Sequence, residues 1–280
     1  MMAAVAAAVL TACGGGGGGS ASVAVPAPTP APVAVARNLS CVAGDAHAVP
    51  YGVLVNNMWN QDSAGTGPRR QCLRVRDTAA GPEYGWSWEW PTTDGIYAFP
   101  ELLVGASPWS AEPSNDNRFP RAVGATRSLQ IAYDAQTVSN GKQNTAAEFW
   151  FTATNLVAGV AEGVPVKAEL MIWTDTAPGI VAIDDLPIAE VVIDGMRWRV
   201  YLQRDWRDVS VSDSSRWTLI SYVATTNSPT ARYDARKFFQ DAIDRGVIAP
   251  GDFVAGLELG NEIISGAGST WLRNVSVSVD

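Results

Sequence analysis

Short segments in which every second residue is apolar recur along most of the chain, and this pattern restricts the fold more than any other feature. Each segment is bounded by Gly, Pro, Asn or Asp, which favour turns. Side chains of a strand point alternately to opposite faces, so the pattern predicts half-buried β-strands. The predicted strands span residues 51–58, 71–76, 85–90, 97–103, 128–135, 146–153, 166–174, 188–193, 196–202, 216–223, 253–260 and 272–279. Asp194-Gly195 between two of them is typical of a tight hairpin turn.

One segment, Asp234 to Arg245, has the periodicity of a helix instead. Asp234 is its predicted N-cap, and Gly246 ends it. Its apolar stripe consists of Phe238, Phe239, Ala242 and Ile243. Many strands and a single helix predict an all-β fold of two packed sheets, a sandwich or jelly roll, that forms one domain over residues 41–280.

The residues before this domain predict a targeting segment and a tether. Cys13 closes Leu10-Thr11-Ala12-Cys13, which is similar to the lipobox of bacterial lipoproteins; the alternative is a Cys that follows an Ala-rich leader by chance. Residues 14–40 begin with six consecutive Gly and continue with Ala, Val, Pro, Ser and Thr, a composition that predicts a disordered tether. We therefore expect an exported bacterial protein, either lipid-anchored through residues 1–13 at the cell surface or in the periplasm, or secreted.

Charge and composition exclude several classes of function. The formal net charge of -8 argues against binding to nucleic acid or to an anionic membrane surface, so the only membrane contact we expect is the lipid anchor. The chain has a single His, His47, which leaves carboxylates as the candidates for catalysis. Cys41 and Cys72 are expected to form a disulfide in an oxidising compartment. We expect a monomer.

Two glutamates lie within apolar segments that otherwise suit a core. Glu169 occurs in Ala168-Glu169-Leu170-Met171-Ile172-Trp173, and strand alternation places Glu169, Met171 and Trp173 on one face. Glu262 lies in a similar setting after Leu257-Glu258-Leu259. Because an unpaired buried carboxylate is unfavourable, each glutamate should have a partner, a cleft or a chemical role. A pair of such carboxylates is what acid–base or glycosyl chemistry requires.

Aromatic residues suggest what the pair acts on. Trp86, Trp88 and Trp90 share one face of their predicted strand. In the strand 146–153, Glu148 and Trp150 share a face. If these faces line the concave side of one curved sheet, they form a groove with carboxylates at its centre and Trp along its length, which suits a polysaccharide. The alternative is that the three Trp of the first strand pack in the core.

Several segments, in the same order, resemble glycoside hydrolase family 12, whose members are exported endo-acting β-glucanases and xyloglucanases with a β-jelly-roll fold and a retaining mechanism. The resemblance covers residues 41–280. The matching segments are VNNMWN at 55–60, Gln71-Cys72, WSWEW at 86–90, the run from Tyr97 to Trp109, AELMIW at 168–173, DARKFFQDAIDRG at 234–246 and LELGNEI at 257–263.

The resemblance implies a role for individual residues. Glu169 would be the nucleophile and Glu262 the acid/base. The helper that hydrogen-bonds the nucleophile would be Glu148, by position; the alternative is Asp134, whose IAYD context copies the family's local motif one strand earlier. Glu258 stands where the family often has Gln, and a carboxylate there would raise the pKa of Glu262. The implied substrate-binding residues are Asn57, Trp59, Trp86, Trp88, Met171, Trp173 and Glu258.

The implied reaction is a double displacement on β-1,4-linked glucans (amorphous cellulose, mixed-linkage glucan or xyloglucan) that needs no metal or other cofactor. Two alternatives stay open at this stage. One is a non-catalytic glycan-binding lipoprotein on the same fold, which would have no need of both Glu169 and Glu262. The other is an enzyme of the same fold that acts mainly by transglycosylation.

Overall fold

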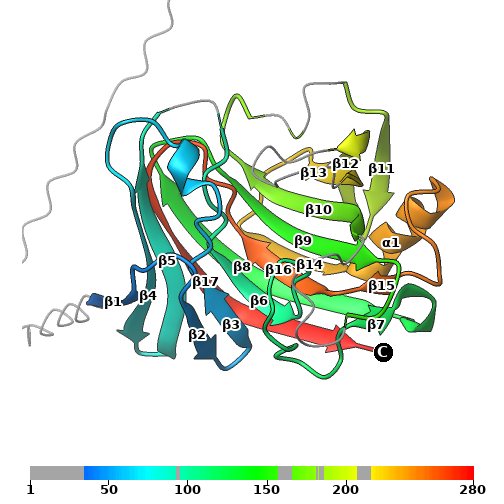
Figure 1. The fold of residues 1–280 in the computed structure, drawn as a ribbon, viewed down its shortest axis with the longest axis horizontal. Coiled ribbons are helices and arrows are strands. Elements are labelled where there is room, and N and C mark those ends of the chain that lie inside the picture. The colour runs from blue at the N-terminus through cyan, green and yellow to red at the C-terminus, as the bar shows by residue number, and fades with distance from the viewer. Residues whose placement is uncertain (1–34, 93–94, 157–165, 181, 183–185, 207–215) are drawn as a thin grey trace, which may run out of the picture. The chain divides into compact units, whose positions relative to one another are not determined.

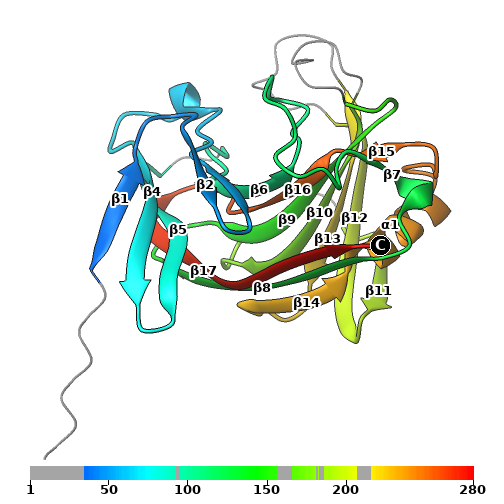
Figure 2. The same cartoon turned by 90° about the horizontal axis from the view of Figure 1, so that it is seen from below.

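The computed structural model describes residues 35–92, 95–156, 166–180, 182, 186–206 and 216–280. Within these residues the backbone forms two β-sheets that pack face to face, one α-helix and two short 3-10 helices, Gln61–Ser63 and Val123–Ala125 (Figure 1, Figure 2). The predicted all-β fold with two packed sheets and one helix is confirmed.

The smaller sheet of the described residues has six strands in the order β1-β4-β5-β17-β8-β14. Its strands pair antiparallel, as in β17 with β5 and β8. Their bounds are β1 (Ala36–Ser40), β4 (Arg70–Thr78), β5 (Gly81–Trp90), β17 (Gly266–Val279), β8 (Leu129–Ser139) and β14 (Thr230–Asp234).

The larger sheet has eleven strands among the described residues, nine of them in the order β11-β12-β13-β10-β9-β16-β6-β3-β2. β10 and β13 pair parallel, whereas β10 and β9 pair antiparallel. The nine are β11 (Ala189–Ile193), β12 (Met196–Trp206), β13 (Trp217–Ala224), β10 (Val166–Thr176), β9 (Asn144–Thr152), β16 (Gly256–Gly260), β6 (Glu101–Gly105), β3 (Gly52–Val55) and β2 (Ala46–Val49). Off this path, β15 (Phe253–Val254) pairs with β7 (Arg121–Ala122) and with β9.

Four strands of the described residues were not predicted: β1, β2, β7 and β14. The first of them, β1, lies inside the segment 14–40 that the sequence assigns to the tether. β1 and β2 contain no buried residue and lack an apolar alternation, and β7 has only two residues, so they carry no pattern to detect. β14 does alternate exposed and buried residues and was missed. The predicted strand 97–103 begins only at Glu101, because Pro100 has no N–H to donate to a neighbouring strand. Residues 1–13, with Cys13, and 14–34 lie outside the described residues.

The predicted hairpin turn and helix are confirmed. Asp194 and Gly195 have φ angles of 50° and 79°, as the two central residues of a type I′ turn require, and they join β11 to β12. The helix α1 spans Ala235–Asp244, and the side chain of Asp234 accepts the N–H of Arg236 at 3.0 Å as an N-cap. None of the helices in the described part of the chain is long and apolar enough to cross a membrane.

The helix α1 contributes two phenylalanines to the core between the sheets. Phe239 packs edge-on against Phe149 and Phe151 of the larger sheet, with ring centroids 5.1 and 5.0 Å apart. Phe238 lies 5.4 Å from the ring of Tyr233 in the smaller sheet. The helix therefore stabilises the packing of one sheet on the other, since its apolar face contacts both.

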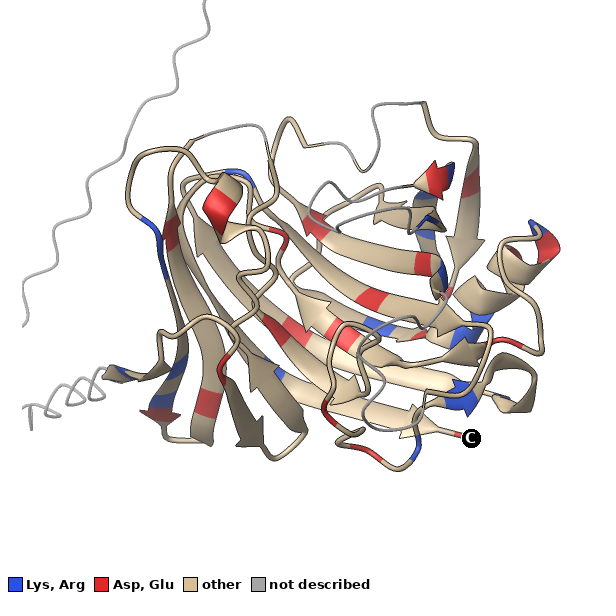
Figure 3. Ribbon diagram, in the orientation of Figure 1, with Lys and Arg blue, Asp and Glu red and all other residues tan. Residues whose placement is uncertain are grey.

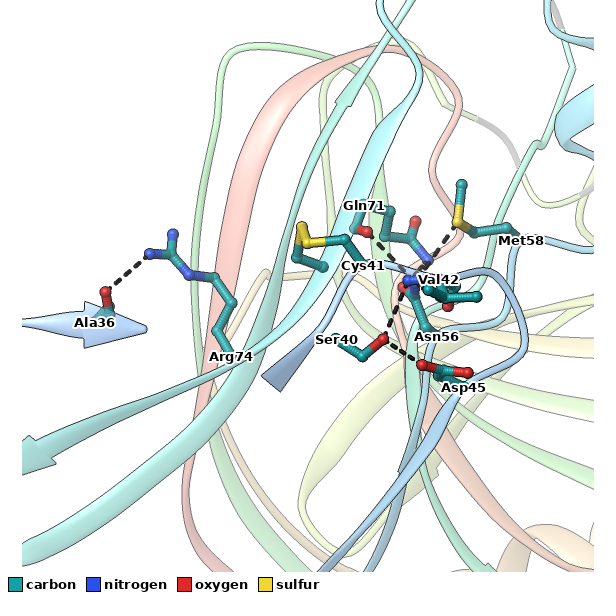
Figure 4. Close-up of a disulfide and its surroundings, with 10 residues drawn as sticks. Ala36, Ser40, Cys41, Val42, Asp45, Asn56, Met58, Gln71 and Arg74 are labelled. Carbon is teal, nitrogen blue, oxygen red and sulfur yellow. Dashed lines mark hydrogen bonds between the residues drawn. A yellow bond between two sulfur atoms is a disulfide. The ribbon is translucent and has the colours of Figure 1, made fainter. Parts of the chain in front are cut away.

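A disulfide joins Cys41, which follows β1, to Cys72 of β4, as the sequence predicts (Figure 4). Close by, Nδ2 of the buried Asn56 donates to the carbonyls of Val42 at 2.8 Å and Gln71 at 3.3 Å. The disulfide and these hydrogen bonds hold the start of the domain against the smaller sheet.

Candidate active site

The strand β10 divides its side chains between two faces, as its alternation predicts. Three of them, fully buried in the core between the sheets, are Ala168, Leu170 and Ile172. Glu169, Met171 and Trp173 point to the opposite face, where they are 8%, 2% and 4% exposed. We call this outer face of the larger sheet the acidic face, because the strand register places glutamates of neighbouring strands on it. These glutamates are Glu101, Glu148, Glu169 and Glu258. Figure 3 marks the acidic positions along the strands in red.

The strand register places the glutamate of β9 between those of its neighbours. Glu148 lies directly opposite Met171 of β10 on one side and Glu258 of β16 on the other. Glu169 is two residues from Met171 along β10, opposite Trp150. Directly opposite residues of antiparallel strands have Cβ atoms about 4.5–5.5 Å apart and share a face. Glu148 is therefore the central carboxyl group of the acidic face.

Glu169 is held by a tryptophan that the sequence does not single out. Nε1 of Trp217 on β13 donates to Oε2 of Glu169 at 2.7 Å, and Trp217 is only 4% exposed. A hydrogen bond to an ionised acceptor is roughly twice as strong as a neutral one. The contact therefore favours the ionised form of Glu169 and orients its carboxylate. The sequence could not indicate this pair, because it depends on the parallel pairing of β10 with β13.

Glu262 lies just after β16, and Asn144 of β9 holds both its backbone and its side chain. Nδ2 of Asn144 donates to Oε2 of Glu262. Oδ1 of Asn144 accepts the backbone N–H of Glu262 at 3.0 Å, and the backbone N–H of Asn144 donates to its carbonyl at 3.2 Å. These contacts fix the direction of the Glu262 side chain. The sequence pattern gave no sign that Asn144 holds Glu262 in place, because Asn before a strand is typical of a turn.

The residue before Glu262 ties the two sheets together. Asn261 is fully buried, and its Nδ2 donates to Oε1 of Gln143 at 2.8 Å and to Oγ1 of Thr145 at 3.0 Å. Its Oδ1 accepts from Nε1 of Trp86 and Oγ1 of Thr270, both at 2.7 Å and both from the smaller sheet. The buried amide therefore has its donors and acceptors satisfied from both sheets, and it anchors the backbone that carries Glu262.

The prediction that Trp86 and Trp88 line the groove is wrong. With Trp90 they belong to β5 of the smaller sheet and turn into the core, where they are 0%, 3% and 2% exposed. Alternation predicts which residues share a face but not which face is buried. Three indoles bury far more apolar surface than the opposite set, Ser87 and Glu89, so the aromatic face turns inward.

The two candidates for the nucleophile's helper lie on different sheets. Asp134 is on β8 of the smaller sheet, and its Oδ2 accepts from Nδ2 of Asn274 at 2.6 Å. Glu148 is on the acidic face, one strand from Glu169. Of the two candidates, Glu148 is therefore the one on the same sheet as Glu169.

Burial raises the pKa of Glu148 well above its usual range, and electrostatic interaction with the carboxyl groups of Glu169, Glu258, Glu101 and Glu262 raises it further. A buried carboxyl group among ionised neighbours keeps its proton, because its own charge would be desolvated and repelled. Protonated, Glu148 has an O–H that can be donated.

Glu258 and Glu101 are also buried on this face, at 4% and 3% exposure. Burial is the main reason why the pKa of each is raised, and the charge of Glu258 raises that of Glu101 further. Nε1 of Trp150 donates to Oε2 of Glu258 at 3.0 Å. Two indole N–H groups, those of Trp217 and Trp150, thus bind carboxylates on either side of Glu148.

Aromatic and amide side chains surround these carboxyl groups. Trp109, which is 44% exposed, packs against Trp150 and Trp217 with ring centroids 5.0 and 5.5 Å apart. Asn57 approaches Oε1 of Glu101 with its Nδ2 at 3.5 Å, and Trp59 is 39% exposed. Trp109 contacts the two tryptophans that donate to Glu258 and Glu169, and its exposed indole ring suits the apolar face of a sugar ring better than a charged ligand. In the sequence, Trp109 only ends the matching run from Tyr97 and was not assigned to the site.

A surface pocket of about 360 Å³ lies elsewhere, over β1, β4 and β5, and its lining includes Asn38, Arg70, Arg74 and Glu89. No glutamate of the acidic face lines it. Among the described residues, no three His, Cys, Asp or Glu side chains are arranged to hold a metal ion.

Solved structures with the same architecture support the jelly-roll assignment. A family 12 xyloglucanase from Bacillus licheniformis superimposes with a TM-score of 0.73 at 21% identity, covering 88% of this chain and 100% of that one. An endoglucanase from Rhodothermus marinus superimposes with a TM-score of 0.67 at 22% identity, covering 88% of this chain and 99% of the other. The predicted β-jelly roll is confirmed.

Sequence comparison agrees with the fold. The chain is 22% identical over 238 residues to the xyloglucan-specific endo-β-1,4-glucanase A of Emericella nidulans, a match that covers 81% of this chain and 85% of the relative. A xyloglucan-specific endo-β-1,4-glucanase A of Aspergillus niger is 22% identical over 240 residues. The sequence profile of glycosyl hydrolase family 12 matches residues 49–280. The match spans most of the chain, and the chain therefore belongs to glycosyl hydrolase family 12.

Proposed function

We propose that this protein is an endo-acting, retaining glycoside hydrolase that cleaves β-1,4-glucosidic bonds in soluble β-glucans. The observation that carries the proposal is a set of three carboxyl groups: Glu169, oriented by Trp217; Glu262, oriented by Asn144; and the buried Glu148, whose pKa both of them raise. Family membership supports the reaction class, because endo-β-1,4-glucanases and xyloglucanases are among the relatives.

Glu169 and Glu262 take different parts in the reaction. Glu169, ionised and oriented by Trp217, attacks the anomeric carbon while Glu262 gives its proton to the departing glycosidic oxygen. A glycosyl–Glu169 ester forms and the aglycone leaves. Glu262, now ionised, takes a proton from water, which attacks the same carbon and releases Glu169. This sequence requires the two carboxyl groups to be about 5–5.5 Å apart.

Glu148 is the partner of the nucleophile in this scheme. It holds a proton because it is buried among carboxylates. Donating that O–H toward Glu169 stabilises the carboxylate while it is the leaving group in the second step. We assign the positioning of Glu262 to Asn144 and Asn261.

Four of the predicted residues are proposed to bind the substrate: Met171, Trp173, Asn57 and Trp59. Met171 and Trp173 share the face of Glu169, and Trp173 donates from Nε1 to the Sδ of Met171 at 3.4 Å. Asn57 and Trp59 would bind the glycone side, with the exposed indole of Trp59 stacked on a sugar ring. Amorphous cellulose, mixed-linkage glucan and xyloglucan are the proposed substrates, xyloglucan because curated relatives are named for it.

The setting of the enzyme is proposed from the N-terminal residues. The disulfide is consistent with export, and a lipidated Cys13 followed by the Gly/Pro-rich tether would hold a monomeric domain away from a membrane. A vesicle-flotation assay of the full chain and of a Cys13→Ser variant tests the anchor.

The decisive experiment removes each proposed catalytic carboxyl group. Glu169→Ala and Glu262→Ala should each lower the release of reducing sugar from mixed-linkage glucan by at least about a thousandfold, with the folded state retained. Glu89→Ala, an exposed glutamate on the outer side of β5, is the matched control and should keep its activity. A variant of Glu169 or Glu262 with near-normal turnover would contradict the assignment. A wild-type protein that binds these glucans but releases no reducing sugar would be a non-catalytic binder instead.

A further inference from the structure

Two carboxylate oxygens on the acidic face are buried without a donor from the described residues. They are Oε2 of Glu101 and Oε1 of Glu258. The two residues are 3% and 4% exposed. A buried, unpaired carboxylate oxygen is unfavourable, so two of them on one face require an explanation.

The strand register explains how these oxygens meet. β6 and β16 pair so that Glu258 lies opposite Leu103 and Glu101 lies opposite Gly260. The two glutamates are therefore diagonal neighbours on one face, and Gly260 has no side chain to separate them. Diagonal positions of paired strands are about 7–8 Å apart, which lets two glutamate side chains reach each other, and interaction with Glu258 raises the pKa of Glu101. Two ionised carboxylates cannot hydrogen-bond, but a single proton between them satisfies both orphan oxygens.

The surroundings indicate which glutamate holds the proton. Glu258 accepts from Nε1 of Trp150 at 3.0 Å, and this contact favours its ionised form. Glu101 receives only a long contact, 3.5 Å from Nδ2 of Asn57. Burial and the charge of Glu258 both raise the pKa of Glu101 well above its usual range. The proton therefore resides on Glu101, and Glu258 is the carboxylate that accepts it.

We propose that Glu101 and Glu258 share one proton and form a positioning pair with a single negative charge, which keeps Glu148 protonated and keeps Glu262 protonated until it donates to the leaving group. This inference rests on the proposed function of Glu169 and Glu262. Among the described residues, the ionisable groups that face the pair are Glu148 from β9, Glu169 from β10 and Glu262 after β16.

The charge of the pair matters because Glu258 lies directly opposite Glu148. A negative charge there makes it harder for Glu148 and Glu262 to ionise, so both remain proton donors at higher pH. If both members were ionised, the two carboxylates would repel each other in a buried site. If both were neutral, the pair would not raise the pKa of Glu148 and Glu262. Glu101 thus acts through other residues and need not touch the substrate.

A double-mutant cycle counts the protons of the pair. The variants are E101Q, E258Q and E101Q/E258Q, which keep the shape of the side chains and supply amide donors. In a pair with one proton, each single Gln only replaces the shared proton, so the total charge stays at one. The double variant loses that charge. The readout is the alkaline limb of the pH profile of kcat/KM on mixed-linkage glucan, an uncharged substrate.

The shared proton predicts a strongly non-additive result. E101Q should keep the alkaline limb in place, and E258Q should shift it only slightly, because the charge moves to Glu101. The double variant should shift the limb to lower pH by about one unit or more, as expected for a lost charge about 8 Å away at an effective dielectric constant near 20. Two ionised carboxylates would instead give additive shifts in both single variants, and two neutral ones would give none; either result overturns the proposal.

Two checks separate this result from other failures. If the proposed function itself is wrong, Glu169→Ala keeps its activity. If only the proposed charge of the Glu101–Glu258 pair is wrong, Glu169→Ala is inactive and only the pH shifts of the double-mutant cycle differ from those expected. Should the double variant fail to fold, carboxyl-¹³C NMR of the wild-type protein decides, with the Glu101 and Glu258 signals assigned by their loss in the single variants. Glu101 should be protonated and Glu258 ionised near neutral pH; both ionised or both protonated overturns the pair.

Discussion

The hydrogen bond from Trp217 to Glu169 can be removed with little change of shape by the substitution Trp217→Phe. Phenylalanine keeps an aromatic ring beside Trp109 and Trp150 but has no N–H to donate. The bond is 2.7 Å long and its partners are 4% and 8% exposed, so water cannot replace the lost donor. The ionised nucleophile should therefore lose a full charge-assisted hydrogen bond.

The size of the effect follows from the charge of the acceptor. A hydrogen bond to a charged group contributes about 1.5–3 kcal/mol, which corresponds to a fall in kcat/KM of about 10- to 150-fold. The acid limb of the pH profile should move to higher pH, because the carboxylate form of Glu169 is the one that loses stabilisation. Both quantities come from initial rates on mixed-linkage glucan across a pH series.

Trp198→Phe is the matched control. Trp198 is fully buried in the core, and its Nε1 donates to the carbonyl of Ile193 at 3.3 Å, away from the acidic face. This variant should lower the melting temperature but leave kcat/KM of the folded enzyme and its acid limb unchanged. The reasoning is refuted if Trp217→Phe keeps wild-type kcat/KM and the wild-type acid limb, or if both variants lose activity only in proportion to their stability.

Three further perturbations act on the supports of the site. Asn261→Ala removes a buried amide that joins the two sheets, and urea denaturation should show a loss of about 3–5 kcal/mol, with kcat reduced because Glu262 is no longer anchored; a loss below about 1 kcal/mol would contradict this. The Cys41→Ser/Cys72→Ser variant opens a link across 31 residues and should lose about 3–4 kcal/mol in the same assay, as should the reduced wild-type protein, with little change in kcat. The melting temperature should be highest at about pH 5. The carboxyl groups with a raised pKa stabilise the fold below their unfolded value of 4.5, and this stability is lost as the pH rises through their folded pKa. Three other carboxyl groups have a lowered pKa, and their contribution to stability is lost as the pH falls through their folded pKa. These are Glu83, Asp116 and Asp194. Glu148→Gln should flatten the decline above pH 5, and a melting temperature that rises steadily to pH 8 would contradict the assignment of raised pKa values.

The sequence predicted the elements whose own pattern determines them. The alternation in β10 correctly separated Glu169, Met171 and Trp173 from the core set, because period two is a property of one strand alone. The N-cap and apolar stripe of α1 and the Asp194-Gly195 turn are local in the same way. The disulfide followed from having two cysteines within the domain.

Contacts between strands could not be predicted from the pattern of any single strand. Nothing in β5 says that its tryptophans face the core, because that depends on which sheet the strand joins and what covers it. Trp217 and Asn144 support Glu169 and Glu262 from other strands, so their roles appear only once the strand order is known. Which of Glu148 and Asp134 lies on the sheet of Glu169 was likewise unknown until the strand order was known.

The central claim is that Glu169 forms a covalent glycosyl intermediate while Glu262 acts as acid and then base. Proton NMR of the first product released from a cello-oligosaccharide tests it most directly, because the initial anomer is recorded before mutarotation. Two displacements at the same carbon predict that the β anomer appears first and the α anomer grows in later. An initial α anomer would mean a single displacement by water, and it would contradict the role of Glu169 as nucleophile.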